Sequence, residues 1–157
     1  MQDQIKVHVI NDQTCMSIDL VSAENLVLTL LAFLQVTTNE VFVYFLEDQA
    51  LAKLHNEIFG DPSLTDTITL PIDAPGCPTY PHVLGEAFIS PQAALRFLEK
   101  KSSISEDIYE EVSRYLVHSI LHMLGYSDTS SEEKRKMRVK ENQLLCMLRK
   151  KNALLTA

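Results

Sequence analysis

Four segments of the chain have the pattern of a β-strand, and the first and third of them alternate between apolar and polar residues with a period of two. They are residues 5–10, 40–47, 65–71 and 83–89. In residues 40–47 both phases are β-branched or aromatic, so we expect this strand to be covered on both faces. A proline-rich loop, residues 72–82, joins the last two strands, and we expect those two strands to pair in antiparallel orientation.

Longer segments carry an apolar residue at every third or fourth position, which predicts amphipathic helices. The expected helices are residues 23–35, 49–59, 91–101, 106–124 and 131–151. Their expected inward stripes are Leu26, Leu30, Phe33 and Leu34 in the first helix, Leu51, Leu54 and Ile58 in the second, and Met137, Leu144, Leu145 and Leu148 in the last.

Polar residues at the expected helix starts support these boundaries, because their side-chain oxygens accept hydrogen bonds from the unpaired N–H groups of a first turn. The expected caps are Ser22, Asp48, Ser90, and two capping boxes formed by Ser103 with Glu106 and by Ser130 with Glu133. The resulting order is strand, helix, strand, helix, two strands and three helices. This order predicts a single α+β domain over residues 1–157, with a mixed four-stranded sheet and a helical C-terminal third.

A pair of histidines gives the helix 106–124 its candidate chemistry. His118 and His122 are four residues apart, so their imidazoles lie on one helix face and can bind one metal ion. Gly125 is suited to end the helix in the left-handed conformation, which lets the chain turn back and bring Asp128 to the open side of the pair. Two nitrogens and one carboxylate oxygen leave a fourth tetrahedral position free, as in a catalytic zinc site. The alternative is two half-buried histidines and an Asp128 that caps a helix.

The spacing His-x-x-x-His-x-x-Gly-x-x-(His or Asp) also occurs in the metzincin proteases. Those enzymes place a glutamate general base directly after the first histidine. Here that position is Ser119, which cannot remove a proton from a bound water at neutral pH. The sequence therefore argues against a protease of that class.

The charge of the chain is unevenly distributed, although its net value of −7 argues by itself against a nucleic-acid partner. Residues 1–130 carry 6 basic and 18 acidic side chains, whereas residues 131–157 carry 8 basic and 3 acidic ones. The basic C-terminal segment follows the candidate metal site directly. It is either a solvated helix face or a surface that binds phosphate beside the metal.

The N-terminal segment does not have the pattern of a signal peptide, and the longest apolar stretch, residues 26–34, is too short to span a bilayer core of ~30 Å. Cys15, Cys77 and Cys146 are odd in number and widely spaced, which predicts neither a disulfide framework nor a Cys-x-x-Cys metal site. We interpret them as reduced thiols of a cytoplasmic protein without a membrane partner.

The histidine segment resembles the signature His-Gly-x-Leu-His-Leu-x-Gly-Tyr-Asp-His of the YbeY family of bacterial metal-dependent endoribonucleases. This chain reads His-Ser-Ile-Leu-His-Met-Leu-Gly-Tyr-Ser-Asp over residues 118–128. Residues 65–71, Thr-Asp-Thr-Ile-Thr-Leu-Pro, resemble the family's Thr-Asp-Val-Leu-Ser-Phe-Pro strand. Residues 84–90, Leu-Gly-Glu-Ala-Phe-Ile-Ser, resemble its Leu-Gly-(Asp/Glu)-Ile-x-Ile-Ser strand. The acids and methionine that the family tends to have downstream are here Glu132, Glu133, Met137 and Glu141.

Two positions depart from the family pattern. The family commonly has an arginine, thought to hold RNA phosphate, six residues before the Thr-Asp pair, and this chain has Phe59 there. The last histidine of the signature is replaced by Asp128, whose carboxylate oxygen can also bind zinc. We interpret these changes as the mark of a variant subgroup.

The resemblance implies a zinc-dependent, single-strand-specific endoribonuclease that acts on ribosomal RNA and the small ribosomal subunit, in maturation of the 16S 3′ end and in ribosome quality control. It implies one zinc ion held by His118, His122 and Asp128 in a cytoplasmic protein, which we expect to be a monomer. The attacking group is either a water whose pKa zinc lowers to about 7 or the substrate's own 2′-hydroxyl.

Further site residues follow from the same reading. Glu86 and Asp66 are candidate general bases, with a structural acid of the sheet and a turn carboxylate as the respective alternatives. Lys134, Arg135 and Arg138 are candidates for binding RNA phosphate.

The remaining histidines and one tyrosine are expected to be structural. We expect His8 at the surface or the sheet edge, His55 and His82 at the surface, and Tyr126 packed beneath the turn. Two other functions stay open: a zinc hydrolase of another substrate such as a peptide, and a non-catalytic ribosome-assembly factor with a structural metal.

Overall fold

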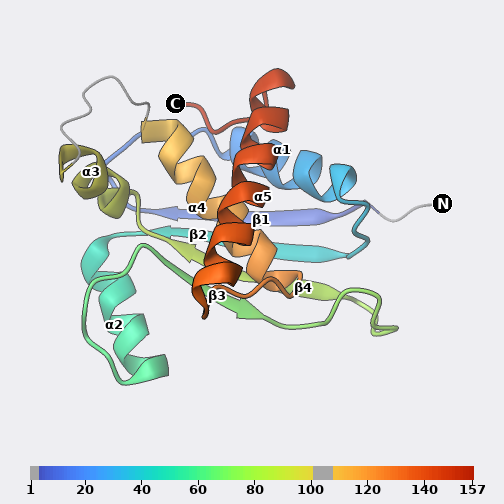
Figure 1. The fold of residues 1–157 in the computed structure, drawn as a ribbon, viewed down its shortest axis with the longest axis horizontal. Helices are drawn as coiled ribbons and strands as arrows, with labels where there is room; N and C mark the ends of the chain where they lie inside the picture. The colour runs from blue at the N-terminus through green and yellow to red at the C-terminus, as the bar shows by residue number, and fades with distance from the viewer. Residues whose placement is uncertain (1–3, 101–107) are drawn as a thin grey trace.

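The structure, a computed structural model, describes residues 4–100 and 108–157. Its strands are β1 (Lys6–Asp12), β2 (Glu40–Leu46), β3 (Thr67–Pro71) and β4 (Val83–Ile89). They form one mixed sheet in the order β1-β2-β4-β3 (Figure 1), in which β1–β2 and β2–β4 are parallel. The pair β3–β4 is antiparallel, which confirms the prediction from the proline-rich loop.

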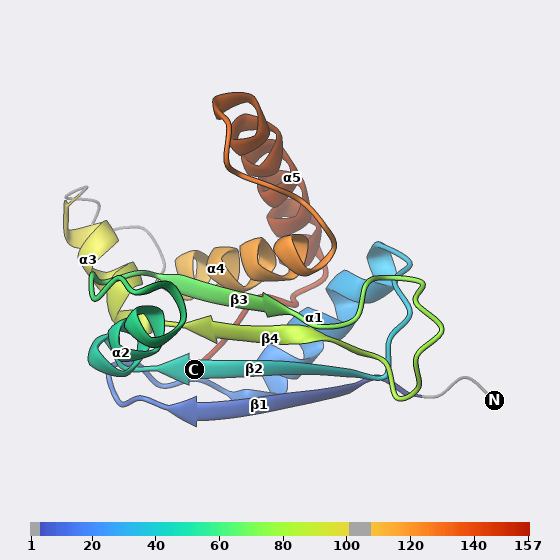
Figure 2. The ribbon, with the colours of Figure 1, turned by 90° about the horizontal axis from the view of Figure 1, so that it is seen from below.

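The helices are α1 (Leu20–Phe33), α2 (Asp48–Phe59), α3 (Pro91–Lys100), α4 (Ile108–Met123) and α5 (Ser131–Lys150). Helix α1 packs on β1, α4 packs on β3 and β4, and α5 packs across α4 (Figure 1). Helix α2 lies beside β3, apart from α4 and α5 (Figure 2). The α+β architecture and the order of elements are as predicted, while the capping box expected at Ser103 and Glu106 lies outside the described residues. None of these helices is long and apolar enough to cross a membrane, as far as the described ranges go.

Helix α1 begins three residues earlier than predicted, because its cap is Asp19 and not Ser22. The Asp19 Oδ1 atom accepts a hydrogen bond from the backbone N–H of Val21 at 3.1 Å. The Ser22 hydroxyl instead donates to the backbone oxygen of Asp19 at 2.6 Å from within the first turn. Ser22 could have capped the helix or bonded within its first turn. The structure shows the second role, in which the side chain is buried.

Two residues of the predicted inward stripes are exposed. Phe33 and Ile58, near the C-terminal ends of α1 and α2, are 52% and 40% exposed, whereas Leu26 and Leu51 of the same stripes are fully buried. Helical periodicity gives the phase of an apolar stripe, but it does not give the length over which a neighbouring element covers it.

The prediction that β2 is covered on both faces is wrong. Its residues that face α1 and α4 are completely buried, but Phe42 and Tyr44 on the alternate phase are only half-buried. Phe42 stacks on His8 of the edge strand β1 with ring centroids 4.4 Å apart, and Tyr44 stacks on Phe88 of β4 at 4.7 Å. These aromatic pairs shield one another across the strands, so that no helix is needed over them.

The C-terminal residues 152–157, for which the sequence pattern predicted no element, are held against α1 and α4. Leu155 is 2% exposed, and its backbone N–H donates to the buried Ser113 hydroxyl at 3.0 Å. The N–H of Thr156 donates to the Ser22 hydroxyl at 3.1 Å. These bonds satisfy two buried serines and fix the chain end to both helices.

The last turn of α4 lies directly on the sheet because Gly85 of β4 has no side chain. A Cβ atom there would lie 3.0 Å from Cγ and Sδ of Met123 and 2.8 Å from the backbone oxygen of Leu70. One turn earlier, the Ser119 and Thr69 hydroxyl oxygens are 2.5 Å apart. The position of the helix end, and of the histidine that it carries, therefore depends on this close approach.

We expect Gly85→Ala to destabilise the protein by about 1–3 kcal/mol, because the added methyl group overpacks the contact with Met123. Urea denaturation gives the free energy of unfolding. The control is a double-mutant cycle with Met123→Ala, which removes the Cγ and Sδ atoms. Gly85→Ala should cost less in the Met123→Ala background than in the wild type, and equal costs in both backgrounds would contradict the close approach.

Candidate metal centre

The turn after α4 adopts the glycine-dependent reversal that the sequence predicts. Gly125 has a φ of +100°, and its N–H donates to the backbone oxygen of His122 at 3.0 Å. The N–H of Tyr126 donates to the backbone oxygen of Leu121, also at 3.0 Å. This pair of bonds is a Schellman motif, and it directs the following residues back across the end of the helix.

The reversal brings the three predicted ligands together. The Nε2 atoms of His118 and His122 are 3.0 Å apart, and Oδ2 of Asp128 lies 3.4 Å from the first and 3.3 Å from the second. Donors bound about 2.0–2.2 Å from a tetrahedral ion lie about 3.3 Å from one another. The triad therefore has the spacing that one such ion requires. Asp128 is not a helix cap, since the cap of α5 is Ser130, whose capping box with Glu133 is as predicted.

Both imidazoles are oriented through their other ring nitrogen. Nδ1 of His118 donates to Oε2 of Glu141 at 2.6 Å, and Nδ1 of His122 donates to the backbone oxygen of Tyr126 at 3.0 Å. A carbonyl and a carboxylate accept but do not donate, so the proton of each neutral ring is on Nδ1. The Nε2 lone pairs of both rings are consequently directed toward Asp128.

This donor set fits a cation. Two imidazole lone pairs and a carboxylate oxygen repel one another at separations of 3.0–3.4 Å unless a positive charge lies between them. Three protein ligands converge here among residues 4–100 and 108–157, which leaves a tetrahedral position for substrate or water. His118, His122 and Asp128 can thus hold a divalent metal ion with an open coordination position.

The surroundings of His118 favour a positive charge on its imidazole. Its burial by itself lowers the pKa of the imidazole, but the hydrogen bond that it donates to Glu141 and the negative charges of Glu141, Asp128 and Asp66 outweigh burial and raise the pKa above its ordinary value. A proton and a metal ion compete for this cluster. Metal affinity should accordingly fall as the pH is lowered.

Glu141 is a supporting residue whose role the sequence reading did not assign. It is 5% exposed, and Arg114 and Arg138 lie 3.4 and 3.7 Å from its Oε1 atom. The signal was present in the sequence, because Glu141 falls between Met137 and Leu144 on the buried stripe of α5. A carboxylate at a buried helical position requires a partner.

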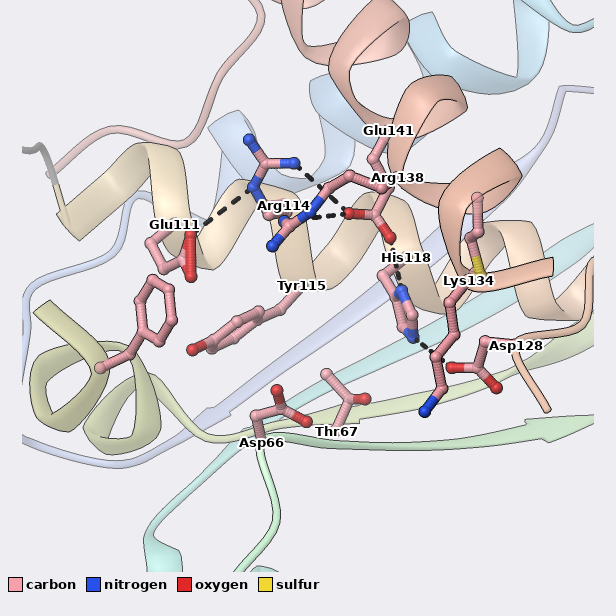
Figure 3. Close-up of a pocket in the computed structure, with 12 residues that line it drawn as sticks. Asp66, Thr67, Glu111, Arg114, Tyr115, His118, Asp128, Lys134, Arg138 and Glu141 are labelled. Carbon is pink, nitrogen blue, oxygen red and sulfur yellow. Dashed lines mark hydrogen bonds and ion pairs between the residues drawn. The ribbon is translucent and has the colours of Figure 1, made fainter. Parts of the chain in front are cut away.

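A cavity of about 290 Å³ lies beside the triad (Figure 3). His118 and Asp128 line it, together with Lys134 and Arg138 of α5 and Asp66 from the segment before β3. Lys134 and Arg138 are on the helix face that carries Glu141, so two of the three basic candidates are next to the metal ligands. The third, Arg135, is exposed and is not among the residues that line the cavity.

Glu86, the other candidate base, is on the opposite face of the sheet from the triad. Its neighbour Gly85 faces Met123 of α4, and successive residues of a strand point to opposite faces. The Glu86 carboxylate accepts a hydrogen bond from the Tyr44 hydroxyl at 3.2 Å on the half-buried aromatic face. This contact fits the alternative stated above, in which Glu86 is a structural acid hydrogen-bonded across the sheet.

Three further expectations need correction. His82 is buried, at 6% exposure, because its ring bridges the Thr38 hydroxyl (2.7 Å) and the backbone oxygen of Ala74 (2.8 Å). His55 is half-buried at the side of α2. The Tyr126 side chain is 39% exposed and not packed beneath the turn. Sequence spacing does not reveal the burial of His82, since it depends on Thr38, a residue distant in the chain.

The chain was compared with known proteins. The sequence model of the family described as "Endoribonuclease YbeY" matches residues 8–149. A protein of Chlamydia pneumoniae named endoribonuclease YbeY is 80% identical over 156 residues, which is 99% of each chain. The protein of the same name from Chlamydia felis is 62% identical over 152 residues, or 97% of this chain and 96% of the relative.

A solution structure of the Thermotoga maritima protein TM1509 has a similar fold. The TM-score is 0.59 at 18% sequence identity, with 94% of this chain and 95% of that chain covered. This likeness supports the architecture of the α+β fold.

We expect Glu141→Gln to weaken metal binding by roughly 10–100-fold, because it removes the charge that orients and polarises His118. Isothermal titration with a divalent metal measures the change. The matched control is Glu132→Gln, an exposed glutamate of the same helix that pairs only with Lys136 among the described ion pairs. Equal affinities of the Glu141→Gln and Glu132→Gln proteins would show that the bond to His118 does not support the site.

Proposed function

Because the chain belongs to the YbeY family, we propose that it is a zinc-dependent endoribonuclease that cleaves single-stranded ribosomal RNA. The observation that carries the proposal is the convergence of two imidazole nitrogens and a carboxylate oxygen at 3.0–3.4 Å beside a cavity that Lys134 and Arg138 also line. The names of the relatives, which span nearly the same length, support the substrate class.

Zinc is the ion that this donor set favours. Two histidines and one carboxylate are frequent ligands of catalytic zinc, and three ligands are the usual number at such sites. His118, His122 and Asp128 would hold the ion, which when bound would polarise a phosphodiester oxygen as a Lewis acid.

Other residues that line the cavity would bind phosphate and accept a proton. Lys134 and Arg138 would hold phosphates that flank the reacting bond, since both line the cavity with the metal ligands. Asp66 lines the same cavity, and we assign to it the role of proton acceptor in preference to Glu86. It would accept a proton from a water or from the 2′-hydroxyl of the substrate.

The wider setting of the reaction follows from the family resemblance. We propose that the substrate is 16S ribosomal RNA of the small subunit, near its 3′ end, and that the enzyme also acts in ribosome quality control. Single-stranded RNA is favoured because its sugar and phosphate are accessible to a site between helices and a sheet edge. The three free cysteines are consistent with the cytoplasm, and we propose a monomer.

We expect the zinc-loaded protein to cleave a single-stranded RNA oligonucleotide and to spare a duplex of the same sequence. A chelator should abolish the cleavage. His122→Ala should lower kcat/KM by more than about 100-fold, because even an outer-shell partner of a metal ligand contributes 10–100-fold. Gel analysis of end-labelled RNA gives the rate, and elemental analysis of the same samples gives the zinc content per chain.

The matched control for this experiment is His8→Ala, which changes a half-exposed histidine of the edge strand β1. It should retain both zinc and activity. Cleavage that survives in metal-free His122→Ala would assign the activity to another site or to a contaminant. Unfolding on chelation, in a protein that cleaves no RNA, would favour the assembly factor with a structural metal.

Asp128→His is expected to cleave faster than the wild type by about tenfold, or ~1.4 kcal/mol of transition-state stabilisation. The carboxylate offsets part of the positive charge that stabilises the reacting phosphate, whereas a neutral imidazole does not. The rates must be compared at equal zinc occupancy, measured in the same samples. A variant that is no faster would contradict this account of the third ligand.

A further inference from the structure

A second cavity, of about 440 Å³, is lined by all three metal ligands, two of which, His118 and Asp128, also line the first. It follows β3 and ends at two residues of α2, His55 and Phe59. Helices α2 and α4 both contact β3, and residues of β3 line the cavity together with the metal ligands and the α2 side chains. A substrate bound at the metal centre can therefore continue along β3 toward α2.

The lining of this cavity differs from that of the first one in charge. No lysine or arginine is among its lining residues in the described part of the chain, whereas Arg114, Lys134 and Arg138 line the first cavity. Two carboxylates, Asp66 and Asp128, are in both linings. The second cavity therefore disfavours a phosphate group and is suited to a neutral part of the substrate.

Phe59 is the apolar surface that such a neutral group would meet. It is the last residue of α2, and its side chain is 60% exposed. The ring of His55, one helical turn earlier, lies 5.3 Å from it between centroids at an angle of 55°. Gly60, with a φ of +68°, ends the helix immediately after it. A large aromatic ring is thus held at the rim of the cavity with most of its surface uncovered.

We propose that Phe59 is a stacking platform for an unpaired base of the RNA, on a nucleotide adjacent to the scissile phosphate. An aromatic face binds any base by stacking, and hydroxyls of the threonines that line β3 can contact the edge of the base. The backbone phosphates would then follow Lys134 and Arg138 while the base enters the second cavity, which no lysine or arginine lines in the described part of the chain. This inference rests on the proposed ribonuclease function and makes Phe59 a specificity-determining residue for unpaired RNA.

The test compares Phe59→Leu, which keeps an apolar side chain without a π-face, with Phe59→Trp, which keeps the stacking surface. Binding of a fluorescein-labelled single-stranded RNA is measured by anisotropy with chelator present, so that the RNA stays intact. Phe59→Leu should weaken binding by about tenfold, and Phe59→Trp should bind within about twofold of the wild type. The metal-loaded proteins should show the same order in kcat/KM.

An abasic scan separates stacking from a structural effect. Abasic nucleotides are placed one at a time along the RNA, and at one position the wild type and Phe59→Leu should bind equally well. The slope of binding against salt should be unchanged in Phe59→Leu, whereas Lys134→Ala should reduce it by about 0.7. The matched control is Ile58→Ala, an exposed apolar neighbour that does not line the cavity and should leave binding unchanged.

Three results would overturn the proposal. They are wild-type binding by Phe59→Leu, an equal loss for Phe59→Leu and Phe59→Trp, and a loss for Phe59→Leu that persists at every abasic position. Each of them leaves the proposed function intact if the wild type cleaves the RNA. A wild-type protein that neither binds nor cleaves single-stranded RNA would instead refute the proposed function, and the stacking role with it.

Discussion

The hydrogen bond between Glu141 and His118 joins the last helix of the chain to the helix that carries the histidine pair. Its 2.6 Å length and the 5% exposure of Glu141 mark a buried, charge-assisted contact. A carboxylate at such a position is costly unless it is paired, and two arginines and an imidazole supply the partners. The packing of α5 on α4 therefore both buries the Glu141 carboxylate with its partners and orients the imidazole of His118.

The sheet also fixes the position of α4, on the side of that helix opposite to α5 (Figure 2). Gly85 allows the end of α4 to rest on β4, and the Schellman turn at Gly125 then returns the chain so that Asp128 reaches the two imidazoles. Two positions without side chains thus set where the helix ends and where the third ligand lies. The cation-binding geometry results from backbone constraints as much as from the ligands themselves.

The two cavities at the triad differ in their basic residues. This difference defines the orientation in which we expect the RNA to bind. The first cavity is lined by basic and acidic residues of α4 and α5. The second is lined by threonines, His55 and Phe59 together with Asp66 and Asp128, and by no lysine or arginine of the described residues. The negative net charge of the chain does not by itself exclude an RNA substrate, because Lys134 and Arg138 place basic side chains next to the metal ligands. Phe59, where the family resemblance leads one to expect an arginine, lines the cavity that has no lysine or arginine among the described residues.

The sequence by itself determined the elements, their order, the helix that carries His118 and His122, and the turn that returns Asp128 to them. These features depend on residues within a few positions of one another, and local spacing and glycine chemistry specify them. The tertiary structure alone decided the side of the sheet on which Glu86 lies, the burial of His82, the partners of Glu141, and the cavity that ends at Phe59. Each of these depends on contact between segments far apart in the chain, and their register and packing cannot be read from the periodicity of one segment.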